Sequence, residues 1–333
     1  MNGTRIIRIG SFNSRYIFTF SALLQALRLG KKHDLIQTTT FNGAFPAWIA
    51  GKINKKPVVL TVHEVWAGKW KEVTEFSRIK ATIHDLLERM IFLLPFDRYV
   101  CVSQATKMDL VKRGIKEEKI KVVYNGIDYS FWNRNHVTKK EIEEVREKLS
   151  LPGKIIYFSW GRPGTSKGFE YAIKAASLAA EKNPNFILML MLGSPHRYKQ
   201  KYHELLSLIT KANQNDIIKV IPSVSYPELR TLLAAIDYVI IPSVAEGFGY
   251  AAAEAAALDK PMIVSDAGSL PEVVSGKHLI FSSKNVADLA EKMVKMSKGE
   301  YQETEKKQFK WDETMAGYLQ VYHQLYKITN GQK

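Results

Sequence analysis

Two glutamates stand out in the stretch PSVAEGFGYAAAEAAALDK. Glu246 lies in a glycine-containing turn, and Glu254 follows in a helix made almost entirely of alanine. A helix that is apolar on all sides is expected to be buried, and a buried carboxylate is costly unless it has partners. Glu254 is therefore expected to face a polar cleft, where it can accept hydrogen bonds from two vicinal hydroxyls such as those of a ribose, or to pair with a buried cation. The alternative is a glutamate that reaches solvent past the small alanine side chains.

A second group of candidate residues lies in the segment SWGRPGTSKGF. Gly161 ends an expected strand, Arg162 follows it, and Lys167 precedes the next helix. A guanidinium and an ammonium group on a glycine-containing loop can close on one polyanion, such as a diphosphate. Gly247 and Gly249 allow a ligand to approach the backbone closely, and free N–H groups at a helix start favour an anion. The alternative is an ordinary basic surface loop.

Two further strand ends carry polar residues. His63, in TVHEVW, can donate a hydrogen bond to a substrate hydroxyl or stabilise a developing charge, although a strand-end histidine is more often structural. In VVYNGIDYSFW, Asn125 and Gly126 predict a turn and Asp128 is placed to cap the next segment of the chain; a plain loop is the alternative. Cys101 lies in the apolar run RYVCVS and is expected to be a buried thiol without catalytic use.

The elements that must position these residues alternate between short β-branched runs and stretches of helical periodicity. This alternation predicts an α/β protein with parallel sheets wound by right-handed crossovers. Because the pattern breaks in FWNRNHVTKKE and then restarts, we expect two doubly wound domains, residues 1–133 and 134–310, followed by a C-terminal helix at 311–329. The run RIIRIGSF, residues 5–12, is expected to form the first strand. Ligands of such sheets bind beyond the carboxyl ends of the strands.

Composition narrows the classes of function. The 333 residues carry a formal net charge of +15 and one cysteine, which favours anionic partners and suits a reducing cytoplasm. No apolar run is long enough to span a bilayer, and the start MNGTRIIRIG does not read as a signal peptide. We expect a cytoplasmic protein that can touch a membrane, and no nucleic-acid partner because no recognition motif is present.

Several nucleotide-site motifs are absent from the sequence. It has no Asp-x-Asp pair, no GxxxxGK[ST] loop, no GxGxxG after a strand and no GxSxG elbow. These absences weigh against dehydrogenase, P-loop and hydrolase functions. A nucleotide diphosphate would have to be held by arginine, lysine and helix N–H groups, so we expect no metal and no cofactor.

Taken in order, these motifs resemble the retaining GT-B glycosyltransferases of family 4. The spacing in GRPGTSKG and the Glu-x7-Glu signature EGFGYAAAE carry most of the resemblance. It implies two Rossmann-like domains facing each other across a cleft, a nucleotide-sugar donor, and transfer without a metal. By the resemblance, Ile221–Val224 would lie near the nucleobase, and the C-terminal helix at 311–329 would pack back on the first domain. The roles it implies are catalysis for His63, Arg162, Lys167 and Glu246, donor binding for Gly161, Gly193, Gly247, Phe248, Gly249 and Glu254, and a hinge at Asn125, Gly126 and Asp128.

The first domain departs from that family's pattern. The opening MNGTRIIRIGSFNSRY lacks the usual glycine pair, and the domain is expected to be short by one or two strand–helix units. Two alternatives therefore stay open beside a glycosyltransferase: a nucleotide-sugar-binding subunit that supports an active partner, and a nucleotide-sugar epimerase. The acceptor can be a glycan, a lipid-linked molecule or a small molecule.

Overall fold

The chain divides into two compact units, each with its own sheet and core. The first unit comprises Met1–Gly68, Ile79–Tyr124 and Asp312–Lys333, and the second comprises Lys69–Arg78 and Asn125–Trp311. The computed structural model describes residues 5–10, 14–149, 153–211 and 216–329.

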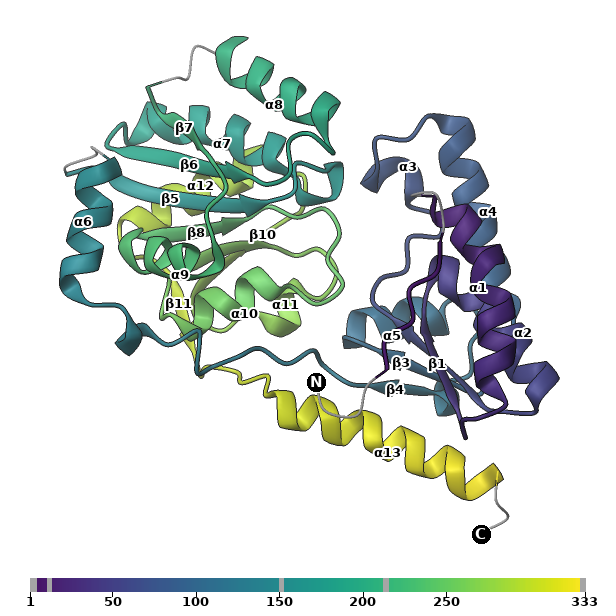
Figure 1. Ribbon diagram of the computed structural model, residues 1–333. Helices are drawn as coiled ribbons and strands as arrows, with labels where there is room; N and C mark the ends of the chain where they lie inside the picture. The colour runs from purple at the N-terminus through teal and green to yellow at the C-terminus, as the bar shows by residue number, and fades with distance from the viewer. Residues whose placement is uncertain (1–4, 11–13, 150–152, 212–215, 330–333) are drawn as a thin grey trace. The chain divides into compact units, whose positions relative to one another are not determined.

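A four-stranded parallel sheet with strand order β1-β2-β3-β4 forms the centre of the first unit within the described residues (Figure 1). The strands are β1 (Ile36–Thr39), β2 (Val58–Val62), β3 (Arg98–Cys101) and β4 (Ile120–Val122). The longer helices of this unit are α1 (Arg15–Gly30), α2 (Ala44–Asn54), α4 (Arg78–Leu93), α5 (Gln104–Val111) and α13 (Trp311–Thr329). Strand β2 is buried at every position, as expected of a central strand covered on both faces.

Alternate residues of β2 point to the two faces of this sheet. Leu60 packs in one cluster with Phe92 of α4 and Leu110 of α5. On the other face, Val59 packs with Val321 and Leu325 of α13. The C-terminal helix therefore belongs to the core of the first unit, although the chain reaches it only after passing through the second.

A seven-stranded sheet lies at the centre of the second unit, again counting the described residues, in the order β11-β10-β9-β8-β5-β6-β7. Its strands are β5 (Ile155–Gly161), β6 (Phe186–Leu192), β7 (Ile218–Ile221), β8 (Tyr238–Ile241), β9 (Met262–Ser265), β10 (Gly276–Phe281) and β11 (Gln302–Thr304). All pairings are parallel except that of β10 with β11. Without β11 the order is that of a Rossmann sheet, and the strand order reverses between β5 and β8.

Helices of the second unit cover both faces of this sheet, as Figure 1 shows. Around the sheet lie α6 (Lys139–Leu149), α7 (Phe169–Lys182), α8 (Lys199–Lys211), α9 (Tyr226–Ala235), α10 (Tyr250–Ala257), α11 (Leu270–Val273) and α12 (Val286–Ser297), and the short α3 (Trp70–Val73) belongs to the separate segment Lys69–Arg78. One buried cluster joins β5 and β6 to α7 and α12 through residues such as Phe169, Leu188 and Met293. Alanines at the inner face of α7 let this helix approach the sheet closely.

Two expectations about strands were wrong. The N-terminal segment Arg5–Gly10 forms no strand, and the rest of RIIRIGSF lies outside the described residues. Its three β-branched isoleucines favour a strand, but no ladder of a neighbouring strand pairs with Arg5–Gly10. Conversely, β11 was not predicted, because its three residues are all exposed and polar and only antiparallel pairing with β10 defines it.

The prediction for Cys101 is confirmed: the thiol is free and buried in β3. Burial raises its pKa to about 12, so the thiolate that a nucleophile needs is not formed near neutral pH. Among the described residues, no helix is long and apolar enough to cross a membrane.

Candidate active site

The predicted phosphate loop follows β5, at the point where the strand order reverses. Gly161 ends the strand, and residues Thr165–Lys167 form a short 3-10 turn before α7. Gly168 adopts φ 65°, and a Cβ at this position would lie 2.0 Å from the carbonyl oxygen of Pro242. The close approach brings the loop against the end of β8, so that Val244 N–H donates to Ser166 O at 2.7 Å.

This approach joins Lys167 to Glu246. The ammonium Nζ lies 2.7 Å from Glu246 Oε2, and Ser243 Oγ donates to the same oxygen at 3.1 Å. Both side chains are partly exposed, so the pair remains open to a ligand. Lysine has three donors, and the bond to Glu246 accounts for one of them. The structure thus brings together the two residues that the sequence placed at different strand ends.

Glu254 lies in α10 and is only 4% exposed. This excludes the alternative of a glutamate that simply reaches solvent. Tyr226, the first residue of α9, donates its phenol hydrogen to Glu254 Oε1 at 2.8 Å. Burial raises the pKa of Glu254 to about 7, although the bond from Tyr226 favours the ionised form. A carboxyl group with this pKa changes its charge in the neutral range.

The start of α10 carries the remaining predicted donor-binding residues. Gly249 is the N-cap with φ 93°, a left-handed conformation that favours glycine. Its neighbour Phe248 is buried, with its ring packed edge-on against those of Tyr250 and Phe309. The Phe248 side chain therefore serves packing, while Gly247 is buried beside it.

Arg162 and Gly193 lie at adjacent strand ends. Gly193 N–H donates to Gly161 O at 2.7 Å, which ties the end of β6 to that of β5. Arg162 Nη1 donates to the Tyr198 hydroxyl at 3.3 Å. The guanidinium also lies 6.0 Å from the Tyr198 ring centroid. Tyr198 therefore orients the arginine at this edge of the sheet.

Three side chains of this region were missed by the sequence prediction: Tyr226, Tyr198 and Glu75. Glu75 belongs to the segment Lys69–Arg78 of the second unit and accepts hydrogen bonds from Thr165 N at 2.6 Å and Thr165 Oγ1 at 3.1 Å. A carboxylate therefore contacts the loop that was predicted to hold phosphate. The capping-box pattern SYPE marks the start of α9, and it was the available signal for Tyr226.

The predicted hinge residues lie where the chain enters the second unit. Asn125 is its first residue after Tyr124, and Gly126 packs so closely on Trp311 that a Cβ would lie 2.7 Å from its Cα. Asp128 Oδ1 accepts hydrogen bonds from Ser130 and Phe131, and these bonds lower the pKa of Asp128. Asp128 thus caps the turn that follows it, which the sequence had left open beside a plain loop. A hinge motion at these residues stays a prediction.

His63 belongs to the first unit, where it follows the end of β2. Desolvation by the surrounding protein lowers the pKa of His63, which favours the neutral imidazole. Its backbone carbonyl accepts a hydrogen bond from Thr106 Oγ1 at 3.4 Å. A neutral imidazole ring carries one donor and one acceptor nitrogen, which is the pair of groups that a sugar hydroxyl can use.

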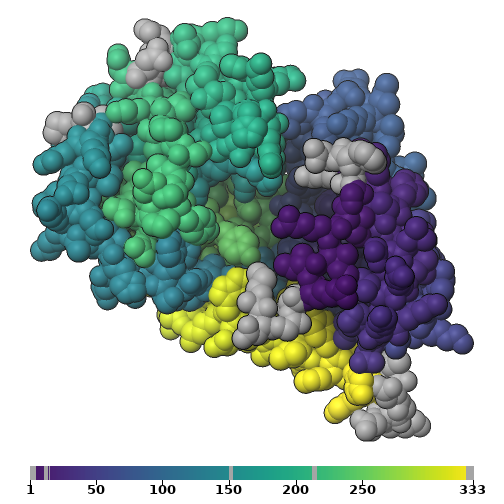
Figure 2. Space-filling view, viewed as in Figure 1, coloured from purple at the N-terminus to yellow at the C-terminus, as the bar shows by residue number. Residues whose placement is uncertain are grey.

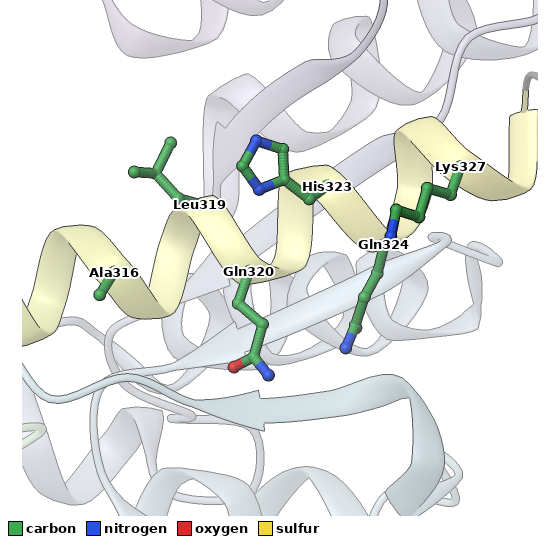
Figure 3. Close-up of a pocket in the computed structure, with 6 residues that line it drawn as sticks. All are labelled: Ala316, Leu319, Gln320, His323, Gln324 and Lys327. Atoms are coloured by element: carbon green, nitrogen blue, oxygen red, sulfur yellow. The ribbon is translucent and has the colours of Figure 1, made fainter.

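The hollow in Figure 3 lies elsewhere in the first unit, along α13. Its lining residues all come from this helix: Ala316, Leu319, Gln320, His323, Gln324 and Lys327. None of them is a predicted site residue. In the described part of the chain, no cluster of three or more His, Cys, Asp or Glu side chains has the arrangement of a metal site.

Comparison with known proteins decides the family. The model of the glycosyl transferases group 1 matches residues 141–313, and that of Glycosyltransferase Family 4 matches residues 3–131. The chain belongs to the group 1 glycosyltransferases. Curated relatives include a D-inositol 3-phosphate glycosyltransferase of Thermomonospora curvata, 25% identical over 73% of this chain, and the mannosylfructose-phosphate synthase of Agrobacterium fabrum, 25% identical over 83%. This glycosyltransferase chain spans 58% and 64% of their respective lengths.

Solved structures show that the fold is GT-B. The sucrose-phosphate synthase of Thermosynechococcus elongatus superposes with a TM-score of 0.76 at 20% identity, covering 98% of this chain and 82% of its own. HepE of Anabaena, crystallised with UDP and glucose, superposes with a TM-score of 0.69 at 19% identity, covering 91% and 80%. The predicted α/β class with two Rossmann-like sheets is confirmed.

Proposed function

We propose that this group 1 glycosyltransferase moves a hexosyl group from a nucleotide-diphosphate sugar to an acceptor hydroxyl, with retention at the anomeric carbon and without a metal. The observation that carries the proposal is the Lys167–Glu246 pair, at 2.7 Å, beside the reversal of strand order in the second unit. A cation for the diphosphate and a carboxylate for the sugar hydroxyls thus meet where Rossmann sheets bind nucleotides.

Each of these residues has a defined role in the proposed reaction. Arg162 and Lys167 bind the diphosphate, and Glu246 binds the sugar. Glu254 accepts hydrogen bonds from the ribose hydroxyls, with Tyr226 holding its carboxylate in position. His63, whose neutral form is favoured by burial, is assigned to the transferred sugar.

The reaction breaks the bond between the anomeric carbon and the leaving phosphate oxygen and forms a bond from that carbon to the acceptor oxygen on the same face. The acceptor proton passes to the leaving diphosphate. Because negative charge grows on the diphosphate as the bond breaks, fixed donors from Arg162, Lys167 and helix N–H groups lower the barrier. Loss of one such donor typically costs ~10²–10³ in rate.

A thermal-shift screen tests the donor site. We expect one nucleoside diphosphate from a panel of bases to raise the melting temperature of the full chain, equally with and without EDTA. Binding of a ligand to the folded state alone stabilises it by mass action, about 2.7 kcal/mol at a hundredfold excess over Kd. If no nucleotide shifts the transition, the donor site is refuted; if the shift requires a divalent cation, the metal-free part of the proposal is wrong.

Product analysis then tests the transfer. With the identified nucleotide sugar and a panel of glycan, lipid-linked and small-molecule acceptors, we expect a glycoside with the anomeric configuration of the donor. An inverted product would refute retention. Conversion of the donor to a second nucleotide sugar without acceptor would indicate an epimerase, and binding without turnover would indicate a supporting subunit.

A further inference from the structure

Helix α4 carries its apolar stripe on the side that faces away from the core. At 3.6 residues per turn, the exposed residues Ile79, Ile83, Leu86, Met90 and Leu93 fall in a stripe about 80° wide. The buried residues of the same helix, Ala81, Glu88 and Phe92, lie on the opposite side. An amphipathic helix normally turns its apolar face inward, so this exposed stripe is not explained by the packing of the first unit.

Basic residues flank this stripe on both sides. On the helical wheel, Lys80 borders one edge, and Arg78 and Arg89 border the other. Of the acidic residues of α4, buried Glu88 accepts a hydrogen bond from Trp66 N. Asp85 accepts one from Gly68 N and forms an ion pair with Arg89, so one of the three bordering cations is already paired on the helix. Long basic side chains beside an apolar surface can place their charges at the level of lipid headgroups.

Helix α1 extends the exposed apolar surface. Its exposed residues Tyr16, Phe20 and Leu24 are four positions apart and share one face. Tyr16 connects the two helices, because its hydroxyl lies 2.8 Å from His84 Nε2 of α4. The sequence of α1 contains no acidic residue and is followed by Lys31 and Lys32. Figure 2 shows this part of the first unit, in purple and blue, at the molecular surface.

Most of the net positive charge of the protein lies in the first unit, which contains α1 and α4. Its 136 residues include 20 lysines and arginines and 10 aspartates and glutamates, which gives +10 of the total +15. The second unit carries the remaining +5 on 197 residues. This surface of the more basic unit is an apolar stripe with positive borders. It is complementary to a surface whose outer layer is anionic and whose interior is apolar.

We propose that α4, with α1 beside it, binds the surface of an anionic lipid bilayer, lying in the interface with its apolar stripe among the acyl chains. This is the mode of an amphipathic helix that does not span the membrane. A second copy of the chain fits less well, because a two-fold contact through α4 would bring its basic borders against each other. The proposal is independent of the proposed transfer reaction, since the surface lies outside the donor site.

Vesicle cosedimentation tests this surface with the full chain and no nucleotide. We expect binding to vesicles of phosphatidylcholine with phosphatidylglycerol, much weaker binding to phosphatidylcholine alone, and weakening by salt because the headgroup attraction is screened. Leu86→Glu/Met90→Glu should lower the partition coefficient on the anionic vesicles at least tenfold. The added negative charge opposes insertion of the stripe among the acyl chains and is repelled by the anionic headgroups.

The matched control is Met315→Glu/Leu319→Glu on α13. These residues are 56% and 51% exposed, against 58% for Leu86 and 54% for Met90, and the added charge is the same. The control should bind within about twofold of the wild type if α4 is the docking element. The proposal would be refuted if both double variants lost vesicle binding equally, or if the wild type did not bind anionic vesicles. A wild-type dimer in solution that the α4 pair dissociates would refute it as well, because the stripe would then be a contact between copies.

Discussion

At the scale of single residues, the fold disfavours the ionised form of the Glu254 carboxyl group. Burial raises its pKa from 4.5 to about 7, so the folded protein binds a proton more tightly than the unfolded chain. The free energy of unfolding therefore falls as pH rises from about 4.5 through about 7, where the carboxyl must ionise in its buried position. One pKa unit corresponds to about 1.4 kcal/mol, so the effect is up to roughly 3 kcal/mol.

We predict that Glu254→Gln removes this pH dependence. Relative to the wild type, the variant should gain up to roughly 3 kcal/mol of unfolding free energy between pH 5 and pH 8, measured by urea denaturation. Glu181→Gln, at an exposed position of α7, is the control and should change stability equally at both pH values. A constant difference between the wild type and Glu254→Gln across this range would show that Glu254 does not titrate there.

Lys167 should contribute to donor affinity through its charge. A hydrogen bond to a charged group is worth about 1.5–3 kcal/mol, so Lys167→Ala should raise the Kd of the nucleoside diphosphate roughly 10- to 100-fold in calorimetry. Lys174→Ala, at an exposed position of α7 in the same unit, should leave the Kd within about twofold. Equal effects of the two substitutions would mean that only net charge matters.

A second variant separates two causes of the loss at Lys167. Removing the lysine also leaves Glu246 without its ion-pair partner, and an unpaired carboxylate would itself repel a diphosphate. In Lys167→Ala/Glu246→Gln that repulsion is absent. We expect the affinity to stay low in the double variant, because the direct bond from Nζ to the phosphate is still missing. Recovery to the wild-type Kd would show that Lys167 only masks Glu246.

At the scale of elements, the approach of the phosphate loop to the end of β8 depends on Gly168. Alanine there would meet both a left-handed backbone, φ 65°, and the Pro242 carbonyl at 2.0 Å. The backbone strain alone is about 1–3 kcal/mol, and the contact can be relieved only by moving the loop. We predict that Gly168→Ala lowers the unfolding free energy by more than about 3 kcal/mol and weakens donor binding.

Gly299→Ala isolates the backbone part of that effect. Gly299 has φ 77° and lies in the same unit, but a Cβ there would meet no atom within 4 Å. Its substitution should cost about 1 kcal/mol and leave donor affinity unchanged. If Gly168→Ala were no more damaging than Gly299→Ala in thermal denaturation, the close approach to Pro242 would not constrain the loop.

The strands of both sheets could be predicted because burial leaves a strong signal in the sequence. FILMLML and PVVLTV are continuous apolar runs, as expected of strands covered on both faces. The segment Arg5–Gly10 also carries β-branched isoleucines but lacks a partner strand, and pairing cannot be read from the segment itself. Strand β11 shows the reverse case, since exposed polar residues form a strand only through their neighbour.

The candidate site likewise has residues that could be predicted from the sequence and contacts that could not. Gly161, Lys167 and Glu246 could be found because they lie at strand ends, and parallel strands bring those ends to one edge of the sheet. The contact of Tyr226 with Glu254 joins two helices 28 positions apart, and it depends on their packing. The Glu75 contact with Thr165 spans 90 positions. No local periodicity encodes contacts of this length.

At the scale of the whole molecule, two separate cores are built from a chain that is not divided in sequence order. One buried cluster of the second unit joins β5 and β6 to α7 and α12, while α13 completes the first unit by packing on β2, β3 and Val123, which follows β4. Residues at the extreme end of the chain therefore stabilise a sheet formed by its first third. Separate cores allow separate unfolding transitions.

Leu325→Ala tests this division. Leu325 is buried between α13 and the sheet of the first unit, and a large-to-small substitution in a core costs about 2–5 kcal/mol. We predict that it lowers the unfolding transition of the first unit in calorimetry, whereas the nucleoside diphosphate raises that of the second. Met315→Ala, at an exposed position of the same helix, should change neither by more than about 0.5 kcal/mol. If Leu325→Ala lowered both transitions equally, the two units would unfold as one cooperative body, and the stabilising effect of the donor would extend to α13.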